Sequence, residues 1–125
     1  MYLGITQETR IMDLQKEFNT FYPYLKLEFF KTHAPRNKIL QKAEKIYPHE
    51  LVQCMTHQYK QVSIHVDYNR TVAQIVVDFR EILGLSILVF RKSGNLWIET
   101  SLTDSWSLER QNKIGESFSN LPNSY

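Results

Sequence analysis

Hydrophobic residues recur along this chain at two alternating spacings. Leu3 and Ile5 stand two apart, which predicts a first strand over residues 1–5. The spacing then becomes helical as far as Pro23, which predicts an amphipathic helix over residues 10–22 that buries Ile11, Leu14, Phe18, Phe21 and Tyr22. A return to alternation predicts a second strand through Leu25, Leu27 and Phe29.

The second half of the chain repeats this order. Val62, Ile64 and Val66 predict a strand. Thr71 with Gln74 forms a capping-box pattern, which opens a predicted helix that Gly84 ends. Its apolar stripe is Val72, Ile75, Val76, Phe79, Ile82 and Leu83.

The two halves match at a constant offset. Phe18 and Phe79 lie 61 positions apart, and at that offset Leu27 matches Leu88 without a gap, as Phe29 matches Phe90. We interpret the match as an internal duplication, with pseudo-repeats 1–61 and 62–116. Two unrelated amphipathic helix–strand pairs are the alternative, because periodicity alone forces part of the match.

A hairpin and a last helix follow the second repeat's helix. The apolar runs 87–90 and 96–98 flank a polar break at 91–95, where Gly94 can take a positive φ, so we expect a tight β-hairpin. Both faces of the first run are apolar, which predicts a central strand or one that faces a partner. Ser107 then predicts the N-cap of a helix that begins at Leu108.

The middle of the chain, residues 33–60, supports two interpretations. Residues 37–46 fit a helix through Ile39, Leu40, Ala43 and Ile46, or a strand that pairs back with residues 26–31. The duplication favours the strand. After Pro48, residues 49–57 have helical composition and would correspond to the helix that opens at Ser107.

These elements predict an α+β fold. We expect a two-layer sandwich built from a duplicated β-α-β(β) unit, with one mixed sheet and both helices on one face. A ferredoxin-like arrangement is favoured, and a β-grasp-like sheet is the alternative. Residues 1–116 form the single expected domain, and the polar residues 117–125 a flexible tail. If Phe30, Ile87, Val89 and Trp97 share the free sheet face, that face needs cover, from the middle segment or from a second subunit in a dimer.

Composition agrees with one globular domain in the cytoplasm. The 125 residues are 42% hydrophobic and 22% charged. No apolar run is long enough to cross a membrane, and the first residues lack the pattern of a signal peptide. The single cysteine, Cys54, excludes an internal disulfide and agrees with a reducing compartment.

The distribution of charged residues favours nucleic-acid binding in only one region of the chain. The net charge of +2 is too small for a general attraction to phosphate. Residues 31–60 hold six basic side chains against two acidic ones, so weak nucleic-acid binding through this segment is an alternative function. A solvated surface connection accounts for the same charges.

Residues typical of catalysis or metal binding occur without the spacing that such chemistry needs. His49, Cys54 and His57 do not reproduce a zinc framework. Ser63, His65 and Asp67 alternate along one strand, which gives a polar row rather than a triad. We therefore expect no catalytic residue, no metal and no cofactor, and rank an enzyme or small-molecule-binding protein last.

Charged and aromatic side chains gather around the hairpin and form our candidate binding surface. Its members are Arg91, Lys92, Trp97, Glu99, Asp104 and Trp106. Trp and Arg dominate binding hot spots, which favours a non-enzymatic protein-interaction module, with a protein partner or a second copy as ligand. Ordinary structural roles, such as a tryptophan that caps the core, account for the same residues.

Several stretches carry a resemblance to a known family. They are LQKEF (residues 14–18), YPYLKLEFFK (22–31), FRKSGNLWIET (90–100) and TDSWSLERQN (103–112). The chain resembles, over most of residues 5–118, a family of small uncharacterised bacterial proteins found mainly in Bacteroidetes. The resemblance implies a compact cytosolic α+β domain without an assigned activity, and it supplies no catalytic residue.

Overall fold

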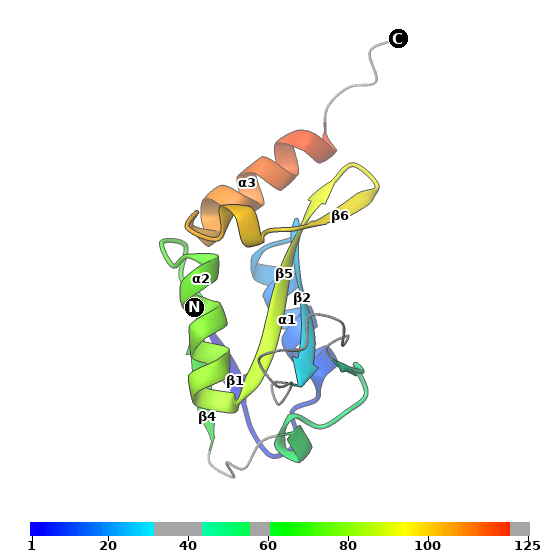
Figure 1. Ribbon diagram of the computed structural model, residues 1–125, viewed down its shortest axis with the longest axis vertical. Coiled ribbons are helices and arrows are strands. Elements are labelled where there is room, and N and C mark those ends of the chain that lie inside the picture. The colour runs from blue at the N-terminus through cyan, green and yellow to red at the C-terminus, as the bar shows by residue number, and fades with distance from the viewer. Residues whose placement is uncertain (32–43, 56–60, 121–125) are drawn as a thin grey trace, which may run out of the picture.

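The computed structural model describes residues 1–31, 44–55 and 61–120. In chain order its main elements are β1 (Tyr2–Ile5), α1 (Ile11–Phe21), β2 (Leu25–Lys31), β3 (Lys45–Ile46), β4 (Val62–His65), α2 (Val72–Asp78), β5 (Leu85–Ser93), β6 (Leu96–Glu99) and α3 (Leu108–Ser119) (Figure 1). Helix α2 continues as a π-helical turn, Phe79–Leu83, and ends at Gly84, whose φ of 68° suits glycine. Short 3₁₀ turns lie at Val52–Met55 and Ser101–Thr103.

The strands form two antiparallel sheets. One pairs β1 with β4, and the other has the order β3-β2-β5-β6. The predicted α+β class and its layered packing are confirmed, but the prediction of a single mixed sheet was wrong. A β-α-β crossover inside one sheet makes parallel strands, whereas α1 and α2 each carry the chain from the small sheet to the large one. The ferredoxin-like arrangement is not confirmed, because it too requires one sheet.

The core lies between the helices and one face of each sheet. Alternate residues of β2 and β5 point into it, namely Leu25, Leu27, Phe29, Leu85, Ile87 and Val89. The helices contribute Ile11, Leu14, Phe18, Val72, Ile75 and Phe79. Ile87 and Val89 therefore do not lie on the free face, where Leu88 and Phe90 stand half-buried instead.

The match between the halves holds in the helices and shifts in the strands. Ile11, Leu14 and Phe18 have their buried equivalents 61 positions on. In the long strands Leu27 and Val89 are directly opposed, so they share a face, while Leu88 points to the other side. The gapless match of Leu27 with Leu88 was therefore wrong, and buried positions of β2 recur at an offset of 60. The duplication itself stays a prediction.

The hairpin is tighter and longer than its sequence suggested. Ser93 pairs with Leu96, so only Gly94 and Asn95 form the turn, with Gly94 at a φ of 63°. Residues 91–93, predicted as part of the loop, belong to β5.

The other predictions for the chain's connections have mixed outcomes. Strand β3 pairs back with β2 at Phe29 and Phe30, so the strand interpretation is confirmed for Lys45–Ile46. Residues 32–43 and 56–60 lie outside the described residues, and the described part of 49–57 holds an isolated bridge from Leu51 to Arg10 and the 3₁₀ turn Val52–Met55 in place of the helix. Helix α3 runs through Ser119, so residues 117–119 are not a tail.

Candidate functional site

Strand β5 has an outer edge that is only partly paired. Strand β6 pairs with its last residues, from Phe90 to Ser93, while β2 pairs with its inner edge from Leu85 to Arg91. Backbone groups of successive strand residues point alternately to the two neighbours. The Lys92 N–H donates to the carbonyl of Tyr24, the residue just before β2. The Val89 carbonyl accepts from the Thr100 N–H on the opposite edge of β5. Even-numbered residues of β5 therefore face β2, and odd-numbered ones face outward.

The outward groups before Val89 have no strand beside them in the described part of the chain. Thr100 donates both its N–H (3.1 Å) and its hydroxyl (2.8 Å) to the Val89 carbonyl, and the chain then turns away. The N–H and C=O of Ile87 and the N–H of Val89 are thus left along an open edge. Edge groups of this kind are the template for pairing with another chain.

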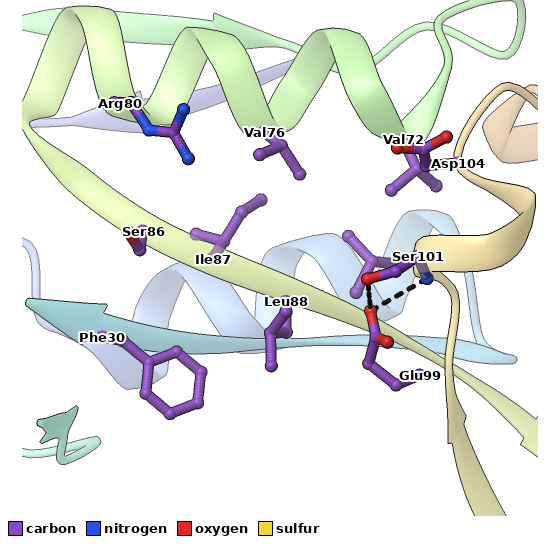
Figure 2. A pocket seen from close by; sticks show the side chains of 11 residues that line it. Phe30, Val72, Val76, Arg80, Ser86, Ile87, Leu88, Glu99, Ser101 and Asp104 are labelled. Atoms are coloured by element: carbon purple, nitrogen blue, oxygen red, sulfur yellow. Dashed lines mark hydrogen bonds between the residues drawn. The ribbon is translucent and has the colours of Figure 1, made fainter. Parts of the chain in front are cut away.

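A groove of about 310 Å³ runs beside this open edge (Figure 2). Figure 2 shows Val72 and Val76 of α2, with Arg80 of the π-helical turn that follows it, along one side, and Phe30, Ser86 and Leu88 of the sheet along the other. Ile87 points towards α2, and Glu99, Ser101 and Asp104 close one end. The lining is mainly apolar, so it favours a ligand that buries apolar groups while it pairs with the strand edge.

The wall formed by α2 is held in place at its first turn. Thr71 and Gln74 form the predicted capping box, with the Thr71 hydroxyl accepting from the Gln74 N–H at 3.1 Å. The N–H of Ala73 donates to the Asp104 carbonyl at 2.9 Å, and that of Val72 to Trp106 at 3.3 Å. Because these bonds satisfy the free donors of the helix end, this end of the groove is preformed.

The corresponding edge in the first half of the chain is closed by side chains. On α1, the Gln15 amide donates to the Leu27 carbonyl and the Asn19 amide to the Leu25 carbonyl, each at 2.9 Å. Sixty-one positions on, Val76 of α2 and Arg80 of the π-helical turn stand in these places. A valine cannot donate a hydrogen bond, so the edge of β5 lacks the cover that β2 has.

Charge is distributed unequally along the groove. Figure 2 places Arg80 at the end near Ser86, and Glu99 and Asp104 at the opposite end. Arg80 is exposed and makes no salt bridge with any described residue. The Glu99 carboxylate is fixed by the Ser101 N–H at 2.9 Å. The groove is thus positive at one end and negative at the other.

The six residues of the candidate binding surface do not form one site. Glu99 and Asp104 meet at the end of the groove. Trp97 and its cross-strand partner Lys92 lie on the free face of the sheet, where the ammonium of Lys26 stands 4.8 Å from the Trp97 ring. The free face therefore extends from the groove to the hairpin.

Arg91 and Trp106 lie elsewhere, beneath α3. Both are half-buried, and the Arg91 guanidinium donates to the Gln111 side chain at 2.8 Å. The Trp106 ring stacks with two guanidinium groups, at 4.0 Å from Arg110 and 5.5 Å from Arg91. Their contacts attach α3 to the hairpin.

Two charged regions singled out in the sequence make local ion pairs. Lys31 pairs with Glu44 at 3.2 Å and Lys45 with Glu28 at 3.4 Å, while the segment's other lysines and Arg36 lie outside the described residues. His65 and Asp67 form a surface pair at 2.6 Å. Hydrogen bonds from the Met1 ammonium and from His65 hold the pKa of Asp67 below its ordinary value.

Neither a metal centre nor a membrane span occurs in residues 1–31, 44–55 and 61–120. No three His, Cys, Asp or Glu side chains of this part gather as ligands would, and His57 falls outside it. No helix in it has the length and apolar content to cross a bilayer. No family model, curated protein or solved structure matches the chain, so the family resemblance stays a prediction.

Proposed function

We propose that this chain is a protein-interaction module that binds an extended peptide segment of its partner along the open edge of β5. The observation that carries the proposal is the row of outward backbone groups at Ile87 and Val89 above an apolar groove. A peptide added as a strand would satisfy these groups, each hydrogen bond contributing about 0.5–1.5 kcal/mol. Side chains on the added strand would gain further affinity by filling the groove.

The free face of the sheet extends the proposed surface to the hairpin. Phe30, Leu88, Phe90 and Trp97 stand half-buried there. Their alternation with the core residues places them on one face, and cross-strand neighbours on a face are close enough to form one apolar surface. A partner bound at the edge of β5 would therefore also contact Trp97.

A groove of this size would also admit a small molecule. A peptide is favoured over a small molecule because the Ile87 N–H, the Ile87 C=O and the Val89 N–H follow one another along the edge as the pairing groups of a β-strand do. A small molecule needs no such repeat. If a second copy of this chain supplied the segment, the protein would form a dimer through this edge.

Filling the groove tests the proposal. An array of synthetic ten-residue peptides would first identify ligands, whose dissociation constants would then be measured by fluorescence anisotropy. We expect Val76→Phe to weaken binding at least tenfold, because the ring would occupy the groove. Val77→Phe is the matched control, since Val77 is 48% exposed and does not line the groove. Equal affinities for both variants, or no ligand in the array, would contradict the proposal.

Truncating the tryptophan tests the extent of the surface. We expect Trp97→Ala to fold normally and to weaken a partner that covers both the groove and the free face, as removal of a half-buried aromatic anchor does. Binding would be measured with the array's tightest ten-residue ligands. A folded Trp97→Ala protein with unchanged affinity for all of them would confine the site to the groove.

We also propose that the two halves are copies of one unit that have diverged at this site. The sheet order β3-β2-β5-β6 is symmetric about its centre, which supports the proposal. In one copy Gln15 and Asn19 close the strand edge, and in the other Val76 and Arg80 leave it open. The open binding edge of β5 would then have arisen when the two amide side chains were replaced by valine and arginine.

A further inference from the structure

We infer that the bound segment is the free C-terminal end of a partner chain, which runs antiparallel to β5 with its carboxylate at Arg80. This inference rests on the proposed function and adds to it the direction, length and charge of the ligand. Three features carry it: the path of β6, the point where β5 begins, and the charges at the two ends of the groove.

The direction follows from the path of β6. This strand runs antiparallel to β5, pairs with it as far as Phe90 opposite Glu99, and leaves the sheet at Thr100. The open edge of β5 continues the same line. Antiparallel pairing is slightly more stable per residue than parallel pairing. A segment in the direction of β6 thus begins near Glu99 and ends near Ser86.

The length follows from the extent of the open edge. Backbone groups are available from Val89 back to Leu85, where the strand begins after the turn at Gly84. Thr100 already stands opposite Val89, so the four residues Leu85–Leu88 remain to be opposed, and about four residues of a ligand are held at roughly 3.4 Å per residue. Beyond Leu85 the strand offers no further pairing groups, which favours a ligand that ends there.

The charges distinguish the two possible directions. An antiparallel ligand places its C-terminal carboxylate beside Arg80, which has no salt bridge within the described residues and can bind a carboxylate with two hydrogen bonds. Its first residues lie beside Glu99 and Asp104, which favour a lysine or arginine. A parallel ligand would place its carboxylate against these two acids, and like charges repel.

The side chains that the groove accepts follow from the faces of β5. Directly opposed residues of an antiparallel pair point to the same side. The ligand residue opposite Ile87 therefore points towards Val72 and Val76, and should be apolar and small. Its neighbour opposite Leu88 lies on the free face beside Phe30, where a larger apolar side chain fits. The ligand is thus a basic residue followed by an apolar C-terminus.

Matched peptide arrays test the inference. One array holds hexapeptides whose last five positions vary and which end in a free carboxylate, and the other holds the same peptides with a C-terminal carboxamide. We expect binding at least tenfold tighter with the carboxylate, and selection of lysine or arginine at the fifth position from the end, just before the residue opposite Leu88. Arg80→Gln should abolish the preference for the carboxylate. Arg110→Gln is the control, because Arg110 is also exposed but stacks on Trp106.

The outcomes separate this inference from the proposed function. If peptides bind and Val76→Phe abolishes binding, while carboxylate and carboxamide bind equally, the segment is internal and the inference is overturned, but the function stands. If neither array binds to the unmodified protein, both are overturned. If light scattering shows a dimer that Val76→Phe dissociates, a second copy occupies the edge, and the C-terminal ligand is overturned.

Discussion

At the scale of single residues, buried polar side chains hold segments that hydrophobic contact alone would leave loose. The Gln111 side chain has no exposed surface and joins three segments. Its amide donates to the Thr103 carbonyl at 2.8 Å and to the Thr103 hydroxyl at 2.9 Å, and its oxygen accepts from Arg91. Nothing in the sequence distinguishes this glutamine from the other glutamines, because its role depends on contacts between distant elements.

Removing the Gln111 amide should therefore cost more than its volume suggests. We expect Gln111→Ala to lower the free energy of unfolding by roughly 1–3 kcal/mol, since the Thr103 carbonyl and the Arg91 guanidinium would lose their partner. Urea denaturation would measure the change. Lys113→Ala on the same helix is the control, because the Lys113 ion pair is exposed, and its effect should stay within about 0.5 kcal/mol.

The phenol of Tyr22 makes stability depend on pH in the alkaline range. Burial, followed by the nearby Tyr68, Asp67 and Glu109, raises the pKa of Tyr22 well above its ordinary value of 10.0. The unfolded chain therefore loses this proton first, and stability should fall as the pH rises above 10. In Tyr22→Phe the fall should be smaller between pH 9 and 11, as urea midpoints would show. Tyr47→Phe, at an exposed tyrosine, should retain the full fall.

Close packing of α3 provides a third residue-scale prediction. A Cβ on Gly115 would lie 2.8 Å from the Tyr24 Cβ and 3.2 Å from the Lys92 carbonyl. We expect Gly115→Ala to destabilise the protein by about 1 kcal/mol or more, despite the better helix propensity of alanine. The thermal midpoint would measure this. Gly4→Ala, where a Cβ meets nothing within 4 Å, should change the midpoint little.

At the scale of elements, the sequence predicts what local periodicity determines. The helices 10–22 and 72–83, the capping box at Thr71 and the helix start at Leu108 are confirmed. Spacing alone could not predict the one-residue shift between halves, because both faces of residues 87–90 are apolar and only pairing with β2 selects Ile87 for the core. The division into two sheets likewise depends on contacts between strands far apart in the chain.

Capping of α2 links the stability of an element to the shape of the groove. Thr71→Ala removes the hydroxyl that accepts from Gln74, and we expect a loss of about 0.5–2 kcal/mol in the free energy of unfolding. Because Val72 and Val76 line the groove, a frayed first turn should also weaken peptide binding. Thr71→Ser, which keeps the cap, should restore both quantities. Loss of stability with unchanged affinity would show that the wall does not depend on the cap.

At the scale of the whole molecule, only part of the candidate site could be predicted from the sequence. Glu99 and Asp104 were predicted, but Val72, Val76, Arg80 and Ser86, which line the same groove, were not. They come from a helix and a strand whose patterns indicated only core positions. A comparison of the two halves could have indicated the site, because Gln15 and Asn19 are replaced by Val76 and Arg80 at the offset of 61. Which edge is open depends on where β6 leaves β5, and no local pattern encodes that.

The open edge of β5 is the claim on which the proposed function and the further inference both depend. Amide hydrogen exchange, followed residue by residue by NMR in the protein without ligand, tests it directly. The N–H groups of Leu88 and Phe90 bond to β2 and should exchange slowly, whereas those of Ile87 and Val89 should exchange at least about tenfold faster, because they lack a strand partner. Equal protection of all four would mean that the edge is already covered, and would contradict the account.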